Sequence, residues 1–103
     1  MNACILADKE TLTGFQLAGI KKCVQAAESK EELLNQFISL HREKETGIII
    51  ISQEISMKLR KEILKVLEEK SLPAVIEIPD KNGVIEGESL IEAITNKAVG
   101  SKM

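Results

Sequence analysis

The sequence predicts an α/β fold in which four parallel strands form one sheet that carries helices on both faces. Short apolar segments alternate with longer segments in which apolar residues recur every three or four positions. Four consecutive isoleucines at positions 48–51 are typical of a central parallel strand, which is covered on both faces. A length of 103 residues allows one domain with a single core.

Four expected strands alternate with four expected helices along the chain. The strands cover residues 2–7, 22–26, 48–51 and 74–78, and the first and last helices cover residues 11–20 and 89–99. Each strand is followed by a helix, because parallel strands need a crossover connection. Right-handed crossovers favour the strand order 2-1-3-4, which makes the sheet a Rossmann-like (receiver-like) half, smaller than a full dinucleotide-binding domain.

Capping residues mark where three of the helices begin. Ser29 with Glu32, and later Ser89 with Glu92, have the spacing of a capping box, in which each residue accepts a hydrogen bond from the other's backbone N–H. Ser52 is expected to cap one long third helix. Apolar residues recur along each of these helices at the spacing of a surface helix with one buried face.

The C-terminal part of the chain differs from the rest. Residues 80–87 form a polar loop with glycines, and the last helix is expected to stop at Gly100 with no fifth strand after it. Its narrow apolar stripe either packs back on the sheet or swings out on the loop. We therefore divide the chain into a globular body at 1–79, a hinge loop at 80–87, and a mobile C-terminal helix with its tail at 88–103.

The composition excludes several classes of partner. The net charge is −2 and the charges are interspersed, so no basic face for a nucleic acid is expected. Aromatic residues make up 2% of the chain, which argues against base-stacking modules. The apolar runs are far shorter than the ~20 residues that cross a bilayer, and no secretion signal is indicated, so no direct membrane insertion is expected.

The cysteines and the single histidine do not match a known site. Cys4 and Cys23 fall in strand-like segments and are expected to be buried free thiols in a reducing compartment. His41 has no nucleophile at a recognisable elbow, and we expect its ring to pack beside Phe37 with the polar tip in water. One histidine cannot complete a Cys/His zinc site, so no metal is expected.

Residues 7–20, ADKETLTGFQLAGI, follow the first strand at the sheet edge where α/β proteins bind ligands. Gly14 and Gly19 imitate a P-loop, but the next lysine does not follow the glycine directly, and no Ser or Thr follows it to bind magnesium. Asp8 occupies the position of a receiver-type magnesium ligand, yet Ser52 stands where a phosphoacceptor Asp should end the third strand. We expect Asp8 to cap the next helix, and neither a cofactor nor catalytic residues are predicted.

Three segments resemble one family in the same order and spacing. Residues 7–20 are similar to the D-K-D/E-T-V-T-G-F-R-L-A-G signature of the F subunit of the archaeal and vacuolar-type (A/V-type) rotary ATPases. GIIIISQEI at 47–55 resembles that family's G-I-I-L-I-T-E-E-I, and PAVIEIP at 73–79 resembles its P-x-I/V-I/V-E-I-P. The chain departs mildly from the pattern, with Ala7 for the usual glycine and Gln16 for the common arginine.

The resemblance implies a non-catalytic component of the central rotor stalk. Such a component binds the long coiled-coil D subunit and helps couple ATP hydrolysis or synthesis in the A3B3 catalytic head to ion movement through the membrane ring. Its mobile C-terminal helix approaches the head and modulates hydrolysis. The resemblance also implies a cytoplasmic location, peripheral on the cytoplasmic face of the cell membrane as part of the complex.

Two groups of residues are expected to bind partners. On the resemblance, the body docks on the D subunit through loops at the carboxyl ends of the strands and an edge of the sheet, and the last helix offers an apolar contact. The expected partner-binding residues are Thr11, Thr13, Phe15, Gln53, Glu54, Leu90, Ile91 and Ile94. Glu77 in the fourth strand faces either a partner at the sheet edge or the covering helices. The alternative function is a degenerate receiver-like signalling module, which needs an acidic magnesium cluster.

Overall fold

The computed structural model describes residues 2–70, 72–79, 83 and 87–101 of the chain. Strands and helices alternate along this part of the chain, except that two helices follow the third strand. They are β1 (Asn2–Ala7), α1 (Lys9–Leu17), β2 (Lys22–Gln25), α2 (Lys30–Arg42), β3 (Thr46–Ser52), α3 (Gln53–Lys58), α4 (Arg60–Glu69), β4 (Ala74–Ile78) and α5 (Leu90–Ser101). The strand bounds agree with the predicted ones to within two residues.

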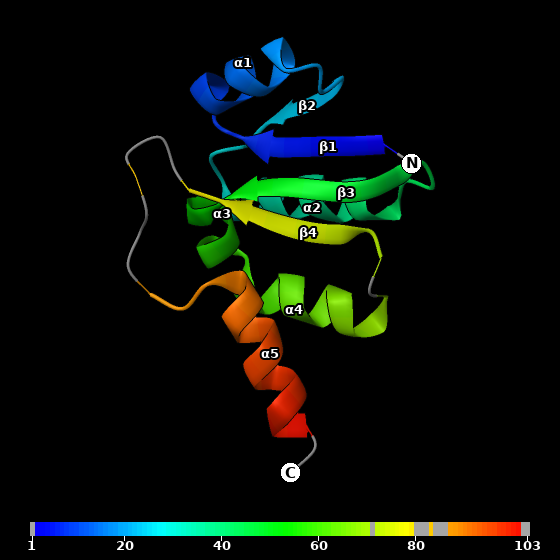
Figure 1. The fold of residues 1–103 in the computed structure, drawn as a ribbon, viewed down its shortest axis with the longest axis vertical. Coiled ribbons are helices and arrows are strands. Elements are labelled where there is room, and N and C mark those ends of the chain that lie inside the picture. The colour runs from blue at the N-terminus through cyan, green and yellow to red at the C-terminus, as the bar shows by residue number, and fades with distance from the viewer. Residues whose placement is uncertain (1, 71, 80–82, 84–86, 102–103) are drawn as a thin grey trace.

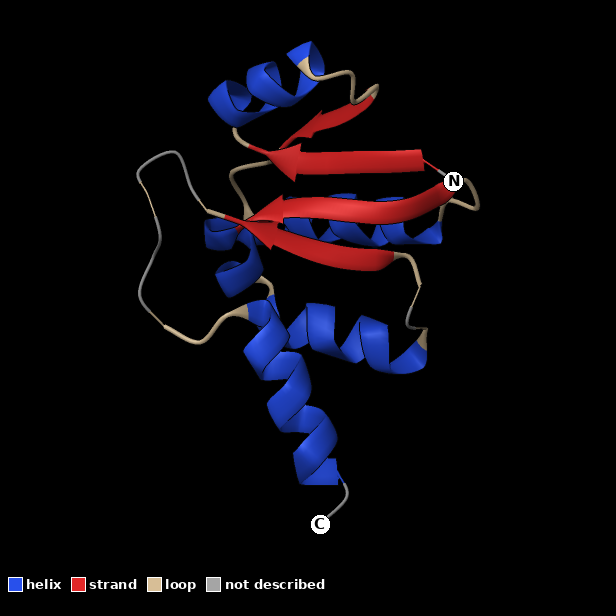
Figure 2. Ribbon diagram, viewed as in Figure 1, coloured by secondary structure: helices blue, strands red, loops and turns tan. Residues whose placement is uncertain are grey.

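All four strands are parallel and form one sheet in the order β2-β1-β3-β4. In Figure 2 the strand arrows point the same way, so their carboxyl ends gather at one edge of the sheet. The central strands β1 and β3 pair with a neighbour on each side, so β3 has the central position that its isoleucine run predicts, although Ile48 is 37% exposed on one face. The predicted fold class and strand order are confirmed.

Helices pack on both faces of the sheet. One face packs against α2, α3 and α4 around the fully buried Phe37, in a cluster that we call the main core. The main core consists of Cys4, Leu6, Leu33, Phe37, Leu40, Ile49, Ile51, Ile55, Leu59, Ile63 and Leu90. The opposite face packs against α1 through a smaller cluster of Ile5, Ala7 and Leu12. Figure 1 shows α2 behind the sheet, while α1 lies next to β2.

Part of the α1 side of the sheet has no covering helix among the described residues. Ile50 packs with the smaller cluster, and its cross-strand partner Ile76 lies on the same side. Ile48 is 37% exposed and Ile76 is 45% exposed. In Figure 1 the ribbons of β3 and β4 lie open toward the viewer. We call the surface formed by Ile48, Ile50 and Ile76 the open sheet face.

The predicted third helix is in fact two helices. α3 ends at Lys58 and α4 begins at Arg60, with the break at Leu59. Leu59 is fully buried, and Ile55 and Ile63 on either side of it also lie in the main core. Because both helices turn the same apolar stripe toward the sheet, the sequence periodicity runs through the break without marking it.

The last helix is longer than predicted. α5 continues through Gly100 to Ser101, because a glycine costs a helix only about 1 kcal/mol and does not forbid it. The expected hinge loop at 80–87 lies largely outside the described residues, which include only Gly83 and Gly87 of this segment. The division of the chain at this loop therefore stays a prediction.

Candidate docking site

The segment after β1 forms the entry to α1. Asp8 is the N-cap: the Thr11 backbone N–H donates to Asp8 Oδ2 at 3.2 Å, and the Thr11 hydroxyl donates to Oδ1 at 2.7 Å. The carboxylate also places a negative charge at the positive end of the helix dipole. The predicted capping role of Asp8 is confirmed, and α1 begins at Lys9, two residues earlier than expected.

A glycine turn ends α1 at Leu17 and brings Phe15 against the sheet. Gly19 has φ of 102°, and the backbone N–H groups of Gly19 and Ile20 donate to the oxygens of Gln16 and Phe15, both at 3.1 Å. These two bonds form a Schellman motif. Phe15 and Ile20 both pack against the smaller core cluster, so the turn fixes α1 on its face of the sheet.

The predicted docking residues of α1 do not share one surface. Thr11 and Phe15 line a shallow hollow of about 540 Å³ together with Gly14. Thr13 is exposed and its hydroxyl donates to the backbone oxygen of Lys9 at 3.0 Å. The structure therefore brings Thr11 and Phe15 together and leaves Thr13 outside the hollow.

The entry to α3 lies at the end of the neighbouring strand β3. Ser52 caps the helix as predicted, because its Oγ accepts from the Ile55 backbone N–H at 3.4 Å. Gln53 is only 5% exposed, whereas Glu54 is exposed. Of the two predicted docking residues in α3, Glu54 is the one that a partner can reach in this conformation.

A pocket of about 230 Å³ joins the two helix entries at the carboxyl edge of the sheet. Asp8 and Ser52 line it, together with Glu54 and Lys58, which form an ion pair at 3.2 Å within α3. Among the described residues, no three His, Cys, Asp or Glu side chains are grouped to hold a metal ion. The pocket has a mixed lining, in which Asp8 and Ser52 cap helices, Glu54 pairs with Lys58, and Ala26, Leu33 and Ile55 are apolar.

α5 places its predicted docking residues in two environments. Leu90 is 1% exposed and belongs to the main core, whereas Ile91 is 74% exposed and Ile94 is 37% exposed. The helix packs on α4 and extends away from the sheet, as Figure 1 shows. In this conformation a partner can reach Ile91 and Ile94, and it can reach Leu90 only if the start of α5 leaves the core.

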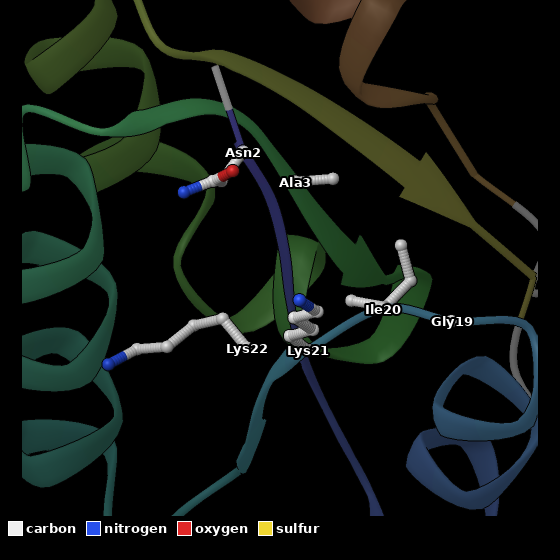
Figure 3. A pocket seen from close by; sticks show the side chains of 6 residues that line it. All are labelled: Asn2, Ala3, Gly19, Ile20, Lys21 and Lys22. Atoms are coloured by element: carbon white, nitrogen blue, oxygen red, sulfur yellow. The ribbon is translucent and has the colours of Figure 1, made fainter.

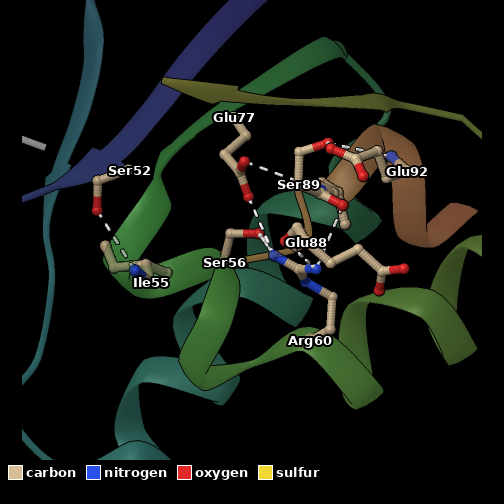
Figure 4. Close-up of polar contacts among 9 residues, drawn as sticks. Ser52, Ile55, Ser56, Arg60, Glu77, Glu88, Ser89 and Glu92 are labelled. Atoms are coloured by element: carbon tan, nitrogen blue, oxygen red, sulfur yellow. Dashed lines mark hydrogen bonds and ion pairs between the residues drawn. The ribbon is translucent and has the colours of Figure 1, made fainter. Parts of the chain in front are cut away.

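A partly buried ion pair, which the sequence does not predict, lies beside the start of α5. Arg60 and Glu77 approach each other at 3.3 Å, and their side chains are 17% and 11% exposed. Figure 4 shows Glu77 pointing from β4 toward Arg60. Glu77 pairs across the sheet with the core residue Ile51, which places it on the helix-covered face. Since 17 positions separate the two charges in the sequence, no local spacing reveals the pair.

Both cysteines are free thiols, as predicted. Cys4 is buried in the main core, and burial raises the pKa of its thiol to about 11. Cys23 is partly buried, and its Sγ donates to the backbone oxygen of Ile20 at 3.2 Å. A reagent in solution can therefore reach the Cys23 thiol more readily than the Cys4 thiol.

The single histidine is more deeply buried than expected. The rings of His41 and Phe37 lie 6.0 Å apart, which agrees with the predicted contact. However, His41 is 4% exposed, and its Nε2 has no hydrogen-bond partner among the described residues. Burial lowers the pKa of His41, and the positive charge of Lys70 adds to this effect. The prediction that the polar tip lies in water is wrong, because α2 turns it inward.

A second pocket lies near the amino ends of the strands. It has a volume of about 400 Å³ and is lined by Asn2, Ala3 and residues 19–22, as Figure 3 shows. Lys22, on its wall, pairs with Glu43 at 3.4 Å. None of the predicted partner-binding residues lines this pocket, so it is separate from the docking edge.

Within the described chain, no helix combines the length and apolar character needed to cross a membrane.

Comparison with known proteins connects this fold to one family. The family model for the ATP synthase (F/14-kDa) subunit matches residues 3–96. The F subunit of the A-type ATP synthase of Pyrococcus abyssi is 33% identical over 103 residues, which cover 97% of this chain and 95% of the relative. The same subunit of Methanosphaera stadtmanae is 41% identical over 81 residues, which cover 77% and 73%. The chain therefore belongs to the family of ATP synthase (F/14-kDa) subunits, which includes the F subunit of the A/V-type rotary ATPases.

Proposed function

We propose that this chain is a non-catalytic component of the central stalk of an A/V-type rotary ATPase. It binds the coiled-coil D subunit and couples ATP hydrolysis or synthesis in the A3B3 head to ion movement. It works in the cytoplasm, peripheral on the membrane as part of the complex. The observation that carries this proposal is the family match over residues 3–96, which includes every predicted docking residue.

The carboxyl edge of the sheet supports a binding role for the body. Asp8 and Ser52 cap helices there, and Glu54 pairs with Lys58. These bonds fix the shape of the edge that a partner would contact. Thr11, Thr13, Phe15 and Glu54 contact the D subunit directly in this proposal, and the buried Gln53 shapes the surface from below.

Exposed apolar side chains support two apolar contacts. The open sheet face includes Ile76 on the edge strand β4, and α5 carries Ile91 and Ile94 on its surface. Apolar side chains gathered on a surface are typical of protein interaction sites. In the proposal the sheet edge rests against the coiled coil of the D subunit, and α5 binds as a helix in a groove of that subunit or of the A3B3 head.

Titration calorimetry with the purified D subunit tests the α5 contact. Replacing Ile91→Ser and Ile94→Ser together should weaken binding by about tenfold or more, because two apolar side chains lose their burial in the complex. Leu17→Ser removes an exposed apolar residue (87%) that lies at the end of α1 and takes no part in the proposed contacts, and it should leave the affinity unchanged. If the wild type, the α5 double variant and the control variant bound with equal affinity, α5 would not contact the D subunit, and the A3B3 head would remain as its proposed partner.

A further inference from the structure

A partly buried polar network holds the start of α5, and Arg60 lies at its centre. The guanidinium donates to the backbone oxygens of Glu88 and Ser89 at 2.9 and 3.3 Å. It also donates to the Glu77 carboxylate at 3.3 Å and to the Ser56 hydroxyl at 3.4 Å. Figure 4 shows these partners converging on Arg60 from α3, from β4 and from the segment that enters α5.

Glu77 completes the network from the strand. One carboxylate oxygen pairs with Arg60, and the other accepts from the Leu90 backbone N–H at 3.4 Å. This N–H belongs to the first turn of α5, where the donors have no partner within the helix. Ser89 accepts from the Glu92 N–H at 3.1 Å, as its predicted capping role requires. The helix start is therefore capped both by its own Ser89 and by a carboxylate from β4.

This network fixes the position of Leu90. Leu90 lies in the main core as the first residue of α5, while the next residue, Ile91, is 74% exposed. Residues 90, 91 and 94 lie on one side of a helix, so the three apolar side chains would form a continuous stripe if Leu90 left the core. The docked helix therefore offers a partner only part of its apolar surface.

We propose that the Arg60–Glu77 pair is a latch that holds α5 against the body and hides Leu90 from partners. With the latch closed, α5 exposes Ile91 and Ile94 alone. With the latch open, the start of α5 leaves the core, and Leu90 becomes exposed together with Ile91 and Ile94. The regulatory meaning of the latch rests on the proposed function, because it governs access to the helix that binds the partner.

A partly buried ion pair is well suited to this task. Partial removal of the two charges from water offsets part of their mutual attraction, so opening the pair and returning both groups to solvent costs little. The Arg60 Nε is buried without a hydrogen-bond partner among the described residues, which lowers the stability of the closed state further. Burial of Leu90 favours the closed state, and a partner that buries Leu90 in its own groove can replace that contribution.

Residue-resolved amide hydrogen exchange in the free, full-length chain tests the latch. Glu77→Gln keeps the shape and an acceptor but removes the negative charge beside Arg60. Arg60→Lys keeps the positive charge but has one nitrogen where the guanidinium uses two, so it cannot bond the two backbone oxygens before α5 and also Glu77 and Ser56. In each variant we expect the first-turn amides of α5 to exchange at least about tenfold faster, while those of β1 and β3 keep their wild-type rates.

The exposed Lys22–Glu43 ion pair provides a matched control for the hydrogen-exchange test. Glu43→Gln breaks the exposed Lys22–Glu43 pair with the same loss of charge and should leave α5 unchanged. Unchanged exchange of α5 in both latch variants would contradict the proposal. Faster exchange of β1 and β3 together with α5, or failure to fold, would also contradict it, because the pair would then support the whole core.

The latch and the proposed function can fail separately. Hydrogen exchange uses the free chain and needs no partner, so a negative result leaves the proposed role in the stalk intact. Calorimetry with the D subunit then measures the consequence: Glu77→Gln should bind more tightly than the wild type if Leu90 joins the interface. Absence of any binding by the wild-type chain would count against the proposed function and leave the exchange result standing.

Discussion

The hydrogen bonds of Asp8 distinguish between two possible roles of this residue, a magnesium ligand and a helix cap. A carboxylate after a parallel strand suits a magnesium site and suits a helix cap equally well. Its two oxygens accept from the backbone and the hydroxyl of Thr11, and Ser52 caps the neighbouring helix. The capping function was predictable because it depends on spacing within one turn. These hydrogen bonds count against the receiver-like alternative.

The two cysteines should differ strongly toward thiol reagents. Cys4 is 1% exposed and its pKa is raised to about 11 by burial, so little thiolate is present or accessible at neutral pH. We expect a native chain treated with a small alkylating reagent to label Cys23 first, and mass spectrometry of the digested protein to locate the label. If Cys4 in the native chain were labelled as fast as it is in denaturant, the burial of Cys4 in the main core would be contradicted.

His41 should make the stability of the chain depend on pH. Burial lowers the pKa of His41 below its ordinary 6.5, so the folded state holds the neutral ring and the unfolded state binds the proton more readily. The contribution to stability is therefore complete above about pH 6.5 and is lost as the pH falls through the lower, folded-state pKa. Urea unfolding at about pH 7.5 and about pH 5.5 measures this loss, and His41→Leu should reduce the difference. If His41→Leu showed the same change of stability with pH as the wild type, the pH dependence would come from other groups and not from His41.

At the scale of elements, the boundaries that depend on short-range chemistry were predictable and those that depend on tertiary packing were not. Ser29 and Ser52 begin helices where the spacing indicates. The passage of α5 through Gly100 escaped prediction because a glycine weakens a helix without ending it. The break at Leu59 escaped prediction because core packing decides it. Arg60 with its distant partner escaped for the same reason, since the fold alone brings α4 and β4 together.

The turn after α1 should depend on its glycine. Gly19 has a positive φ of 102° and open space where a Cβ would lie, so Gly19→Ala meets backbone strain alone and should cost about 1 kcal/mol of stability. Gly14 also has open space but lies inside α1, so Gly14→Ala should stabilise the chain by about 0.5 kcal/mol. Denaturant unfolding compares the two. Equal effects of the same sign would contradict the Schellman turn.

At the scale of the molecule, a body with a well-packed core carries a helix attached through few contacts. The open sheet face, the pocket at the carboxyl edge and the exposed side of α5 are three separate surfaces on one small chain. The sequence resemblance predicted the family, which the comparisons confirm, whereas the docking residues stay a prediction. It did not distinguish the buried Leu90 and Gln53 from the accessible Ile91, because burial follows from the three-dimensional arrangement of α3, α4 and α5.

The proposed place of the chain in a rotary ATPase is most directly tested by affinity purification of the tagged, full-length chain from its native cells. We expect the D subunit to be recovered with it, and the A and B subunits of the catalytic head to accompany them. As a matched comparison, the Ile91→Ser and Ile94→Ser double variant should recover less of the complex. Recovery of the wild-type chain without the D, A or B subunits, under conditions that keep the complex intact, would contradict the proposed function.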